Sequence, residues 1–130
     1  MNSALEYMTN LRPTLVNEYR TPDRRYSESC ALIAVDIAKR LLAENKTPYI
    51  AVVRGKLIDS INRADIIPKP FQGRILWGAH LLCCENGLAY DPMVDSKPLA
   101  INNYCTTAFE GEVDMNIIVA QEQIKEFVKR

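Results

Sequence analysis

The dipeptide Asn86-Gly87, which separates two apolar runs, constrains this chain more than any other short segment. Asn-Gly is the strongest short signal for a two-residue β-hairpin turn, because both central positions of that turn need a positive φ. The sequence therefore predicts one strand over residues 74–84 and a return strand over residues 88–91.

This hairpin brings the only histidine of the chain close to an aspartate. A two-residue turn pairs Leu82 with Asp91, and His80 shares the face of Leu82 because side chains alternate along a strand. His80 is then one diagonal step from Asp91, at a Cα separation of about 7 Å that still allows contact. A three-residue turn would reverse the parity, so the contact depends on the turn type. Pro92 follows Asp91 and fits a strand that stops there.

A second apolar segment, residues 30–44, has the periodicity of a buried helix. Its apolar positions at helical spacing are Cys30, Ile33, Ala34, Ile37 and Leu41. Cys30 opens this helix, and we expect Ser27 or Ser29 to be the N-cap. A helix N-terminus and a nearby imidazolium both stabilise a thiolate, so this position suits a nucleophilic thiol.

The other segments complete a small mixed domain. We expect a helix over residues 2–19 that is broken at Pro13, strands over residues 49–53, 104–109 and 114–119, and a terminal helix over residues 121–130. Residues 56–73 contain two prolines and are expected to be a long connection beside the site. The prediction is a single α+β domain over residues 1–130, in which a central helix packs on an antiparallel sheet of about four to five strands.

Composition narrows the classes of function. The 16 basic and 16 acidic side chains balance, and no basic stripe appears, so we do not expect a nucleic-acid partner. Residues 1–15 lack the basic start and apolar run of a signal peptide, and no apolar stretch is long enough to cross a bilayer. We predict a soluble cytoplasmic protein, without a membrane partner, whose four cysteines are free thiols.

Cys30, His80 and Asp91 supply the groups that cysteine-nucleophile chemistry needs. In the expected mechanism the Cys30 thiolate attacks a carbonyl carbon, protonated His80 gives its proton to the leaving amine, and Asp91 fixes the tautomer of the ring. The Cys30 backbone N–H, at the helix start, would meet the developing oxyanion. The second oxyanion donor is left open among Asn17, Tyr19, Tyr26 and Gln72.

The arrangement resembles the transglutaminase-like superfamily of papain-fold cysteine enzymes. The matching elements lie within residues 27–92: Ser-Cys-Ala at 29–31 opening a long helix, His80 in a later strand, and Tyr-Asp-Pro at 90–92 after a tight turn. The resemblance implies a papain-like fold, with a nucleophile, a general base and an orienting acid at Cys30, His80 and Asp91.

The chain departs from that family at two places near the triad. Many members have an aromatic residue two positions after the histidine, where this chain has Leu82. Many also have Gly or Gln just before the cysteine, where this chain has Glu28-Ser29.

The predicted function is thiol acyl chemistry on an amide or peptide bond, as in a cysteine protease, amidase or deamidase. Hydrolysis is favoured over acyl transfer because nothing in the sequence identifies an amine site. The expected partner is a peptide, a protein or a small amide substrate, with no cofactor and no metal; the oligomeric state is left open. The alternative is a non-catalytic binding module of the same fold.

A metal-binding domain is a lesser alternative, since Cys83 and Cys84 follow His80 closely. Strand geometry opposes it, because Cys83 faces away from His80 and Cys84 lies about 13 Å along the strand, too far for one tetrahedral ion. By the same alternation, Trp77 is expected on the face opposite His80, in core packing.

Overall fold

The computed structural model describes residues 3–18 and 25–129, together with their side chains except at positions 18 and 25–28. In chain order the elements are α1 (Ala4–Glu18), α2 (Arg25–Ala43), β1 (Tyr49–Gly55), β2 (Ile67–Pro68), the 3₁₀ turn η1 (Lys69–Phe71), β3 (Ala79–Glu85), β4 (Leu88–Tyr90), β5 (Leu99–Ala100), α3 (Ile101–Ala108), β6 (Phe109–Glu110), β7 (Val113–Val119) and α4 (Ile124–Val128). Within these residues no helix combines the length and the apolar character needed to cross a membrane.

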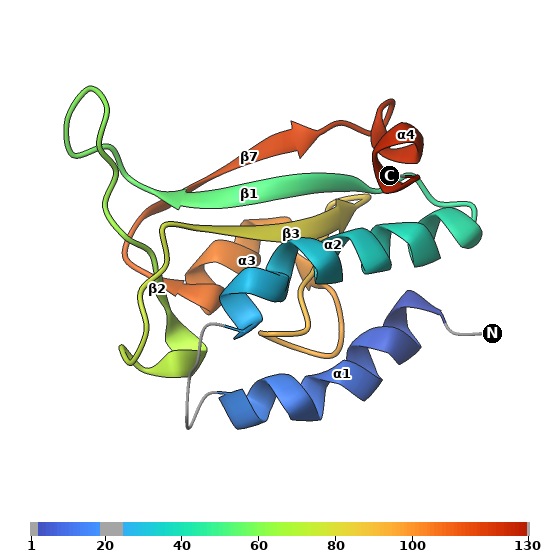
Figure 1. The fold of residues 1–130 in the computed structure, drawn as a ribbon, viewed down its shortest axis with the longest axis horizontal. Helices are drawn as coiled ribbons and strands as arrows, with labels where there is room; N and C mark the ends of the chain where they lie inside the picture. The colour runs from blue at the N-terminus through green and yellow to red at the C-terminus, as the bar shows by residue number, and fades with distance from the viewer. Residues whose placement is uncertain (1–2, 19–24, 130) are drawn as a thin grey trace.

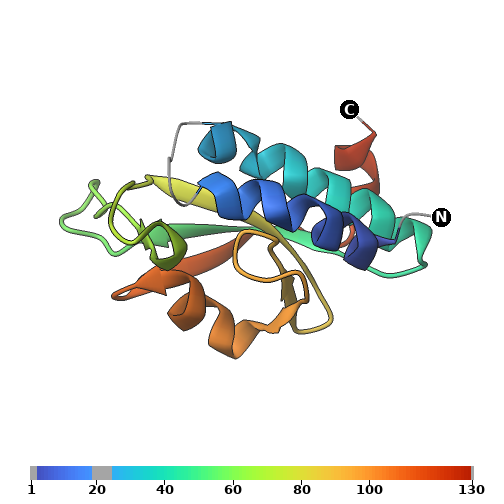
Figure 2. The same cartoon turned by 90° about the horizontal axis from the view of Figure 1, so that it is seen from below.

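The strands form one main antiparallel sheet in the order β5-β4-β3-β1-β7, and β2 pairs with β6 in a separate two-stranded sheet. Helices α1 and α2 lie on one side of the main sheet and α3 lies on the other (Figures 1 and 2). This architecture confirms the prediction of an α+β fold with a helix packed on an antiparallel sheet.

The core forms where α2 packs on the central strands. The helix buries Ala34, Ile37 and Leu41 at the spacing that the sequence predicts. Strand β1 pairs with β3 on one side and β7 on the other, and its central residues are buried. The long helix is therefore held against a strand that cannot shift without breaking two ladders.

The hairpin between β3 and β4 has the predicted register. Asn86 and Gly87 have φ values of 51° and 78°, as a two-residue turn with two positive φ angles requires. Glu85 pairs with Leu88, and the ladder continues to its last pair, Cys83 with Tyr90. The predicted turn and parity are therefore confirmed.

Strand β4 is much shorter than β3, and this difference creates an open edge. Along its other edge β3 pairs with β1 from Ala79 to Cys84. On the outer edge, the strands of the described chain provide β3 with no partner before Cys83. The segment from Ala79 to Leu82, which contains His80, is therefore open to other elements on that edge.

Two helix predictions need correction. Helix α2 begins at Arg25, so Ser27 and Ser29 lie inside it, and the prediction that one of them caps it at Cys30 is wrong. Helix α1 continues through Pro13 instead of breaking there.

Three further segments differ from their predicted form. Strand β3 begins only at Ala79, and the terminal helix α4 is shorter than predicted. The predicted strand over residues 104–109 is mostly helix α3. There Ile101, Tyr104, Cys105 and Ala108 follow helical spacing, while the β-branched Thr106 and Thr107 among them favour a strand.

Candidate active site

Asp91 lies directly after β4, where the open edge of β3 begins, and it makes the contact with His80 that the hairpin register predicts. The Asp91 Oδ2 atom lies 2.9 Å from His80 Nε2. Both side chains are buried, at 5% and 1% exposure. Asp91 Oδ1 also accepts a hydrogen bond from the Met93 backbone N–H at 3.1 Å, which is an Asx-type turn around Pro92.

Cys30 comes from α2 and completes a chain of three interacting groups. Its thiol lies close enough to the His80 side chain and to the backbone N–H of Leu81 for both to lower the pKa of the thiol. Since Asp91 occupies Nε2 of the ring, Nδ1 is the nitrogen left to face the sulfur. The structure thus brings together Cys30, His80 and Asp91, the three residues that the sequence analysis selected.

The charges of this group stabilise one another. Burial alone would lower the pKa of His80, but the charge of Asp91 and its hydrogen bond outweigh burial and raise it to about 9. Burial likewise opposes the charge of Asp91, yet His80 and the other donors hold the pKa of that carboxyl below its usual value. At neutral pH the pair therefore favours an imidazolium next to a carboxylate.

Cys30 differs from the other cysteines of the chain in the direction of its pKa shift. Burial raises the pKa of Cys30, but the hydrogen bond and charge of His80 and the Leu81 N–H bring it below the ordinary thiol value. Burial raises the pKa of Cys83, of Cys84 and of Cys105, that of Cys84 to about 12. None of the four cysteines forms a disulfide, and Cys30 is the one whose pKa is lowered toward neutral pH.

Trp77 lies beside the histidine, and the prediction that it occupies the opposite face is wrong. Its ring stacks on that of His80 with centroids 5.0 Å apart and an interplanar angle of 16°. Because β3 begins only at Ala79, strand alternation does not extend back to Trp77; this residue bridges to Ile66 instead. Trp77 is buried, as predicted, and its stacked face shields the imidazolium and can stabilise its charge.

Tyr104 is a member of the site that the sequence analysis missed. Its hydroxyl donates to Asp91 Oδ2 at 2.5 Å from α3, and its side chain is fully buried. The missed signal was the helical spacing of residues 101–108, which places Tyr104 on the inner face of α3.

The Cys30 backbone N–H, which the sequence predicts as an oxyanion donor, is used within helix α2. With α2 beginning at Arg25, the Cys30 amide lies in the second turn, where a helical N–H donates to the carbonyl four residues earlier. The prediction that this amide would meet an oxyanion is therefore wrong. Of the candidates for the second donor, Asn17 and Gln72 are exposed, Tyr19 lies outside the described residues and the side chain of Tyr26 is not described.

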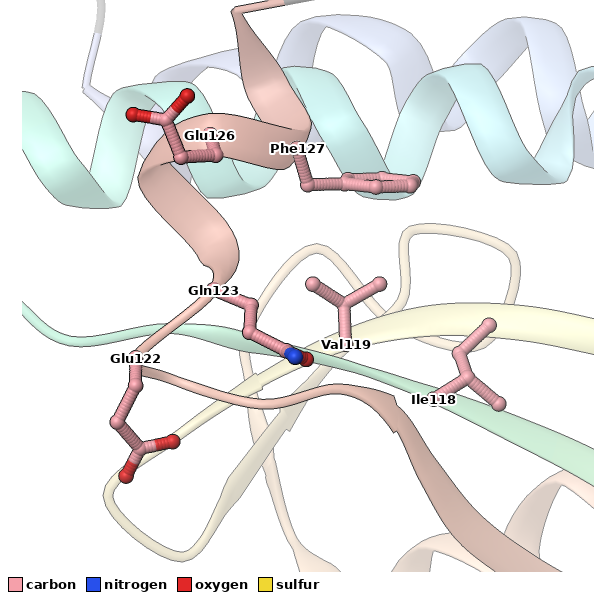
Figure 3. A pocket seen from close by; sticks show the side chains of 6 residues that line it. All are labelled: Ile118, Val119, Glu122, Gln123, Glu126 and Phe127. Carbon is pink, nitrogen blue, oxygen red and sulfur yellow. The ribbon is translucent and has the colours of Figure 1, made fainter.

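Other parts of the described chain offer neither a metal cluster nor a competing thiol site. No group of three or more His, Cys, Asp or Glu side chains within these residues could hold a metal ion. A pocket of about 500 Å³ lies between α4 and the end of β7 (Figure 3). Its lining residues are Ile118, Val119, Glu122, Gln123, Glu126 and Phe127. None of these is a thiol or an imidazole, so the pocket cannot perform the chemistry predicted for Cys30.

Comparison of the chain with protein-family models, with curated proteins and with solved structures gives no match. The function of the site is therefore inferred from the geometry and electrostatics of its own residues.

Proposed function

We propose that this protein is a cysteine hydrolase that cleaves an amide or peptide bond, with a transglutaminase-like arrangement of Cys30, His80 and Asp91. The proposal is carried by the buried His80–Asp91 pair, with its atoms 2.9 Å apart, and by the electrostatic interaction of that pair with the Cys30 thiol. The direction of the Cys30 pKa, opposite to that of the other three thiols, supports the same role.

In the proposed reaction, the Cys30 thiolate, paired with the His80 imidazolium, attacks the carbonyl carbon. The tetrahedral intermediate collapses to a thioester as the imidazolium gives its Nδ1 proton to the leaving amine. Water, deprotonated by the now neutral His80, then hydrolyses the thioester, which releases the acid and restores the thiolate–imidazolium pair. Asp91 stays ionised throughout and holds the Nε2–H of the ring.

Alkylation by iodoacetamide across pH tests the first step, with peptide mapping to identify the modified cysteine. The wild-type protein should be alkylated at Cys30 well below the ordinary thiol pKa. His80→Ala should return Cys30 to ordinary thiol behaviour and slow its alkylation at pH 7 by about tenfold or more. If Cys30 titrates as an ordinary thiol and His80→Ala changes nothing, activation by the histidine is wrong.

A second candidate function, a non-catalytic binding module of the same fold, is favoured by two observations at the nucleophile. Cys30 is only 6% exposed, and its backbone amide is committed to α2. A screen with a library of peptides and small amides separates the two candidates. Turnover that Cys30→Ser abolishes would eliminate the binding module, whereas an activated thiol with no turnover on any substrate of the library would favour it.

A further inference from the structure

Asp91 accepts more hydrogen bonds than the predicted triad needs. His80 Nε2 and the Tyr104 hydroxyl share its Oδ2 atom, at 2.9 Å and 2.5 Å, while the Met93 N–H occupies Oδ1. Tyr104 reaches the carboxylate from α3, on the opposite side of the sheet from α2 (Figure 2). The carboxylate is therefore fixed by groups from three separate parts of the chain.

The Tyr104 hydroxyl adds a hydrogen bond to the Asp91 carboxylate, whereas the packing at this position needs only the ring. The ring is fully buried and meets Phe109 edge to face with centroids 6.2 Å apart, and Phe109 in turn contacts the His80 ring at 5.8 Å. A phenylalanine would fill the same space and bury the same ring. What only tyrosine adds at this position is an O–H donor aimed at a buried negative charge.

A buried His–Asp pair that holds one proton has two competing forms. In one the proton is on the ring and both groups are charged; in the other it is on the carboxylate and both are neutral. Burial favours the neutral form, because charges are costly away from water. Donors on the carboxylate favour the charged form, since they stabilise the anion and have no comparable effect on the protonated acid.

We propose that Tyr104 is a positioning residue that keeps the shared proton of the His80–Asp91 pair on the imidazole ring. This inference rests on the proposed activation of Cys30 by His80. With the ring as an imidazolium, the Cys30 thiolate has a cation beside it. With the proton on Asp91, the ring is neutral and the thiol keeps its own proton.

Two thiols and one guanidinium also act on Asp91 or on the loop that follows it. Cys30 on α2 and Cys84 on β3 are within electrostatic reach of the carboxylate, and a thiolate at either position would add negative charge. The Arg12 guanidinium of α1 donates to the backbone carbonyls of Pro92 and Met93 in the adjoining loop. The carboxylate itself accepts hydrogen bonds from His80, from Tyr104 and from the Met93 backbone amide.

The test is Tyr104→Phe, read by the rate of Cys30 alkylation with iodoacetamide from pH 6 to pH 10. We expect a fall of about tenfold at pH 7, the size expected for losing one hydrogen bond to a charged group, and no difference where an unassisted thiol is already ionised. Tyr7→Phe is the matched control, because it removes a tyrosine hydroxyl that donates to Asp36 at 3.2 Å, away from the site. A Tyr104→Phe profile equal to wild type, or slowed equally at every pH, overturns the proposal.

A double-mutant cycle with Asp91→Asn separates a local electrostatic role from a structural one. In the Asp91→Asn background Tyr104→Phe should have no further effect on the alkylation profile, because the charge on which it acts is gone. A full additive effect in that background overturns the proposal. His80→Ala distinguishes this failure from that of the proposed function: if it leaves the profile of Cys30 at its wild-type form, activation itself is wrong.

A measurement on the wild-type protein removes dependence on any variant. The chain has a single histidine, so ring-¹⁵N labelling reports His80 without ambiguity. At pH 7 we expect both ring nitrogens to give imidazolium signals. A neutral ring at that pH overturns the proposal, whatever the behaviour of Tyr104→Phe.

Discussion

The two ends of the candidate site are held in different ways. His80 and Asp91 are joined by a hairpin, lie 11 residues apart in sequence, and are surrounded by buried partners on several elements. Cys30 lies in a long helix, separated by 50 positions from His80, and depends on the docking of α2 against β3. The His80–Asp91 pair therefore belongs to the architecture of the fold, whereas helix packing adds the Cys30 thiol to it.

This difference predicts unequal costs of removing the two ends. Asp91→Ala leaves a buried imidazole, a buried phenol and a backbone amide without their acceptor, and should lower the free energy of unfolding by about 3 to 5 kcal/mol. Cys30→Ala removes a small thiol but leaves His80 its larger stabilising partner, Asp91, and should cost only about 1 kcal/mol. Urea denaturation of both variants measures the difference.

Equal losses of unfolding free energy for Asp91→Ala and Cys30→Ala would contradict this difference between the two ends of the site. Asp91→Asn is the control for volume: it keeps the shape of the side chain and loses only the charge, so its cost should lie between the other two.

The pH dependence of the free energy of unfolding should report the ionisation of His80 and Asp91. The pKa of His80 is raised from 6.5 to about 9, so its contribution is complete below pH 6.5 and is lost as the pH rises through 9. The lowered pKa of Asp91 acts at the other end, with a contribution present above pH 3.8 and lost as the pH falls through the folded-state value. Stability should therefore be greatest between these limits and fall by about 3 kcal/mol toward pH 9.

Cys30→Ala is the right background for this measurement. The lowered pKa of Cys30 contributes in the opposite direction, adding stability as the pH rises, and the substitution removes that contribution. It also removes the smaller part that Cys30 adds to the raised pKa of His80, while the larger part from Asp91 remains. Unfolding by urea from pH 4 to pH 9 gives the profile. A further His80→Gln substitution should flatten it above pH 6.5, and a decline that persists without the histidine would contradict the assignment.

The sequence predicts the His80–Asp91 pair better than it predicts the surroundings of Cys30. Asn86-Gly87 determines the turn, the turn determines the parity, and parity alone places His80 beside Asp91; every step is local. The start of α2 was misplaced because Ser27 and Ser29 read as caps while the structure extends the helix to Arg25. Trp77 is placed on the wrong face and Tyr104 is not selected, because both reach the site through tertiary packing. The helical spacing of residues 101–108 indicates only that Tyr104 lies on the buried face of its own helix.

Substitutions in the Asn86-Gly87 turn have a smaller expected effect and test whether the turn fixes the contact between His80 and Asp91. Gly87 has a φ of 78° with open space where a Cβ would stand, so Gly87→Ala should cost about 1 kcal/mol through backbone strain alone. Gly111→Ala is a matched control, with a φ of 70° and similar open space outside this hairpin. Both should be destabilised similarly in urea, but only Gly87→Ala should also broaden the ring-¹⁵N signals of His80, because only that turn sets its register. Identical His80 spectra would mean that the tertiary partners hold the pair without the turn.

The smallest expected effect concerns the first turn of α2. A proline at position 29 cannot donate to the Arg25 carbonyl, so Ser29→Pro should unwind the helix before Cys30 and place the thiol near a new N-terminus. A helix N-terminus stabilises an anion modestly, so alkylation of Cys30 at pH 7 should rise by about two- to fivefold. Ser29→Ala keeps the helix and should leave the rate unchanged. If Ser29→Pro instead abolishes the reactivity of Cys30, the extended first turn is itself needed to hold the thiol near His80, and the position of Cys30 depends on the fold as much as that of the His80–Asp91 pair.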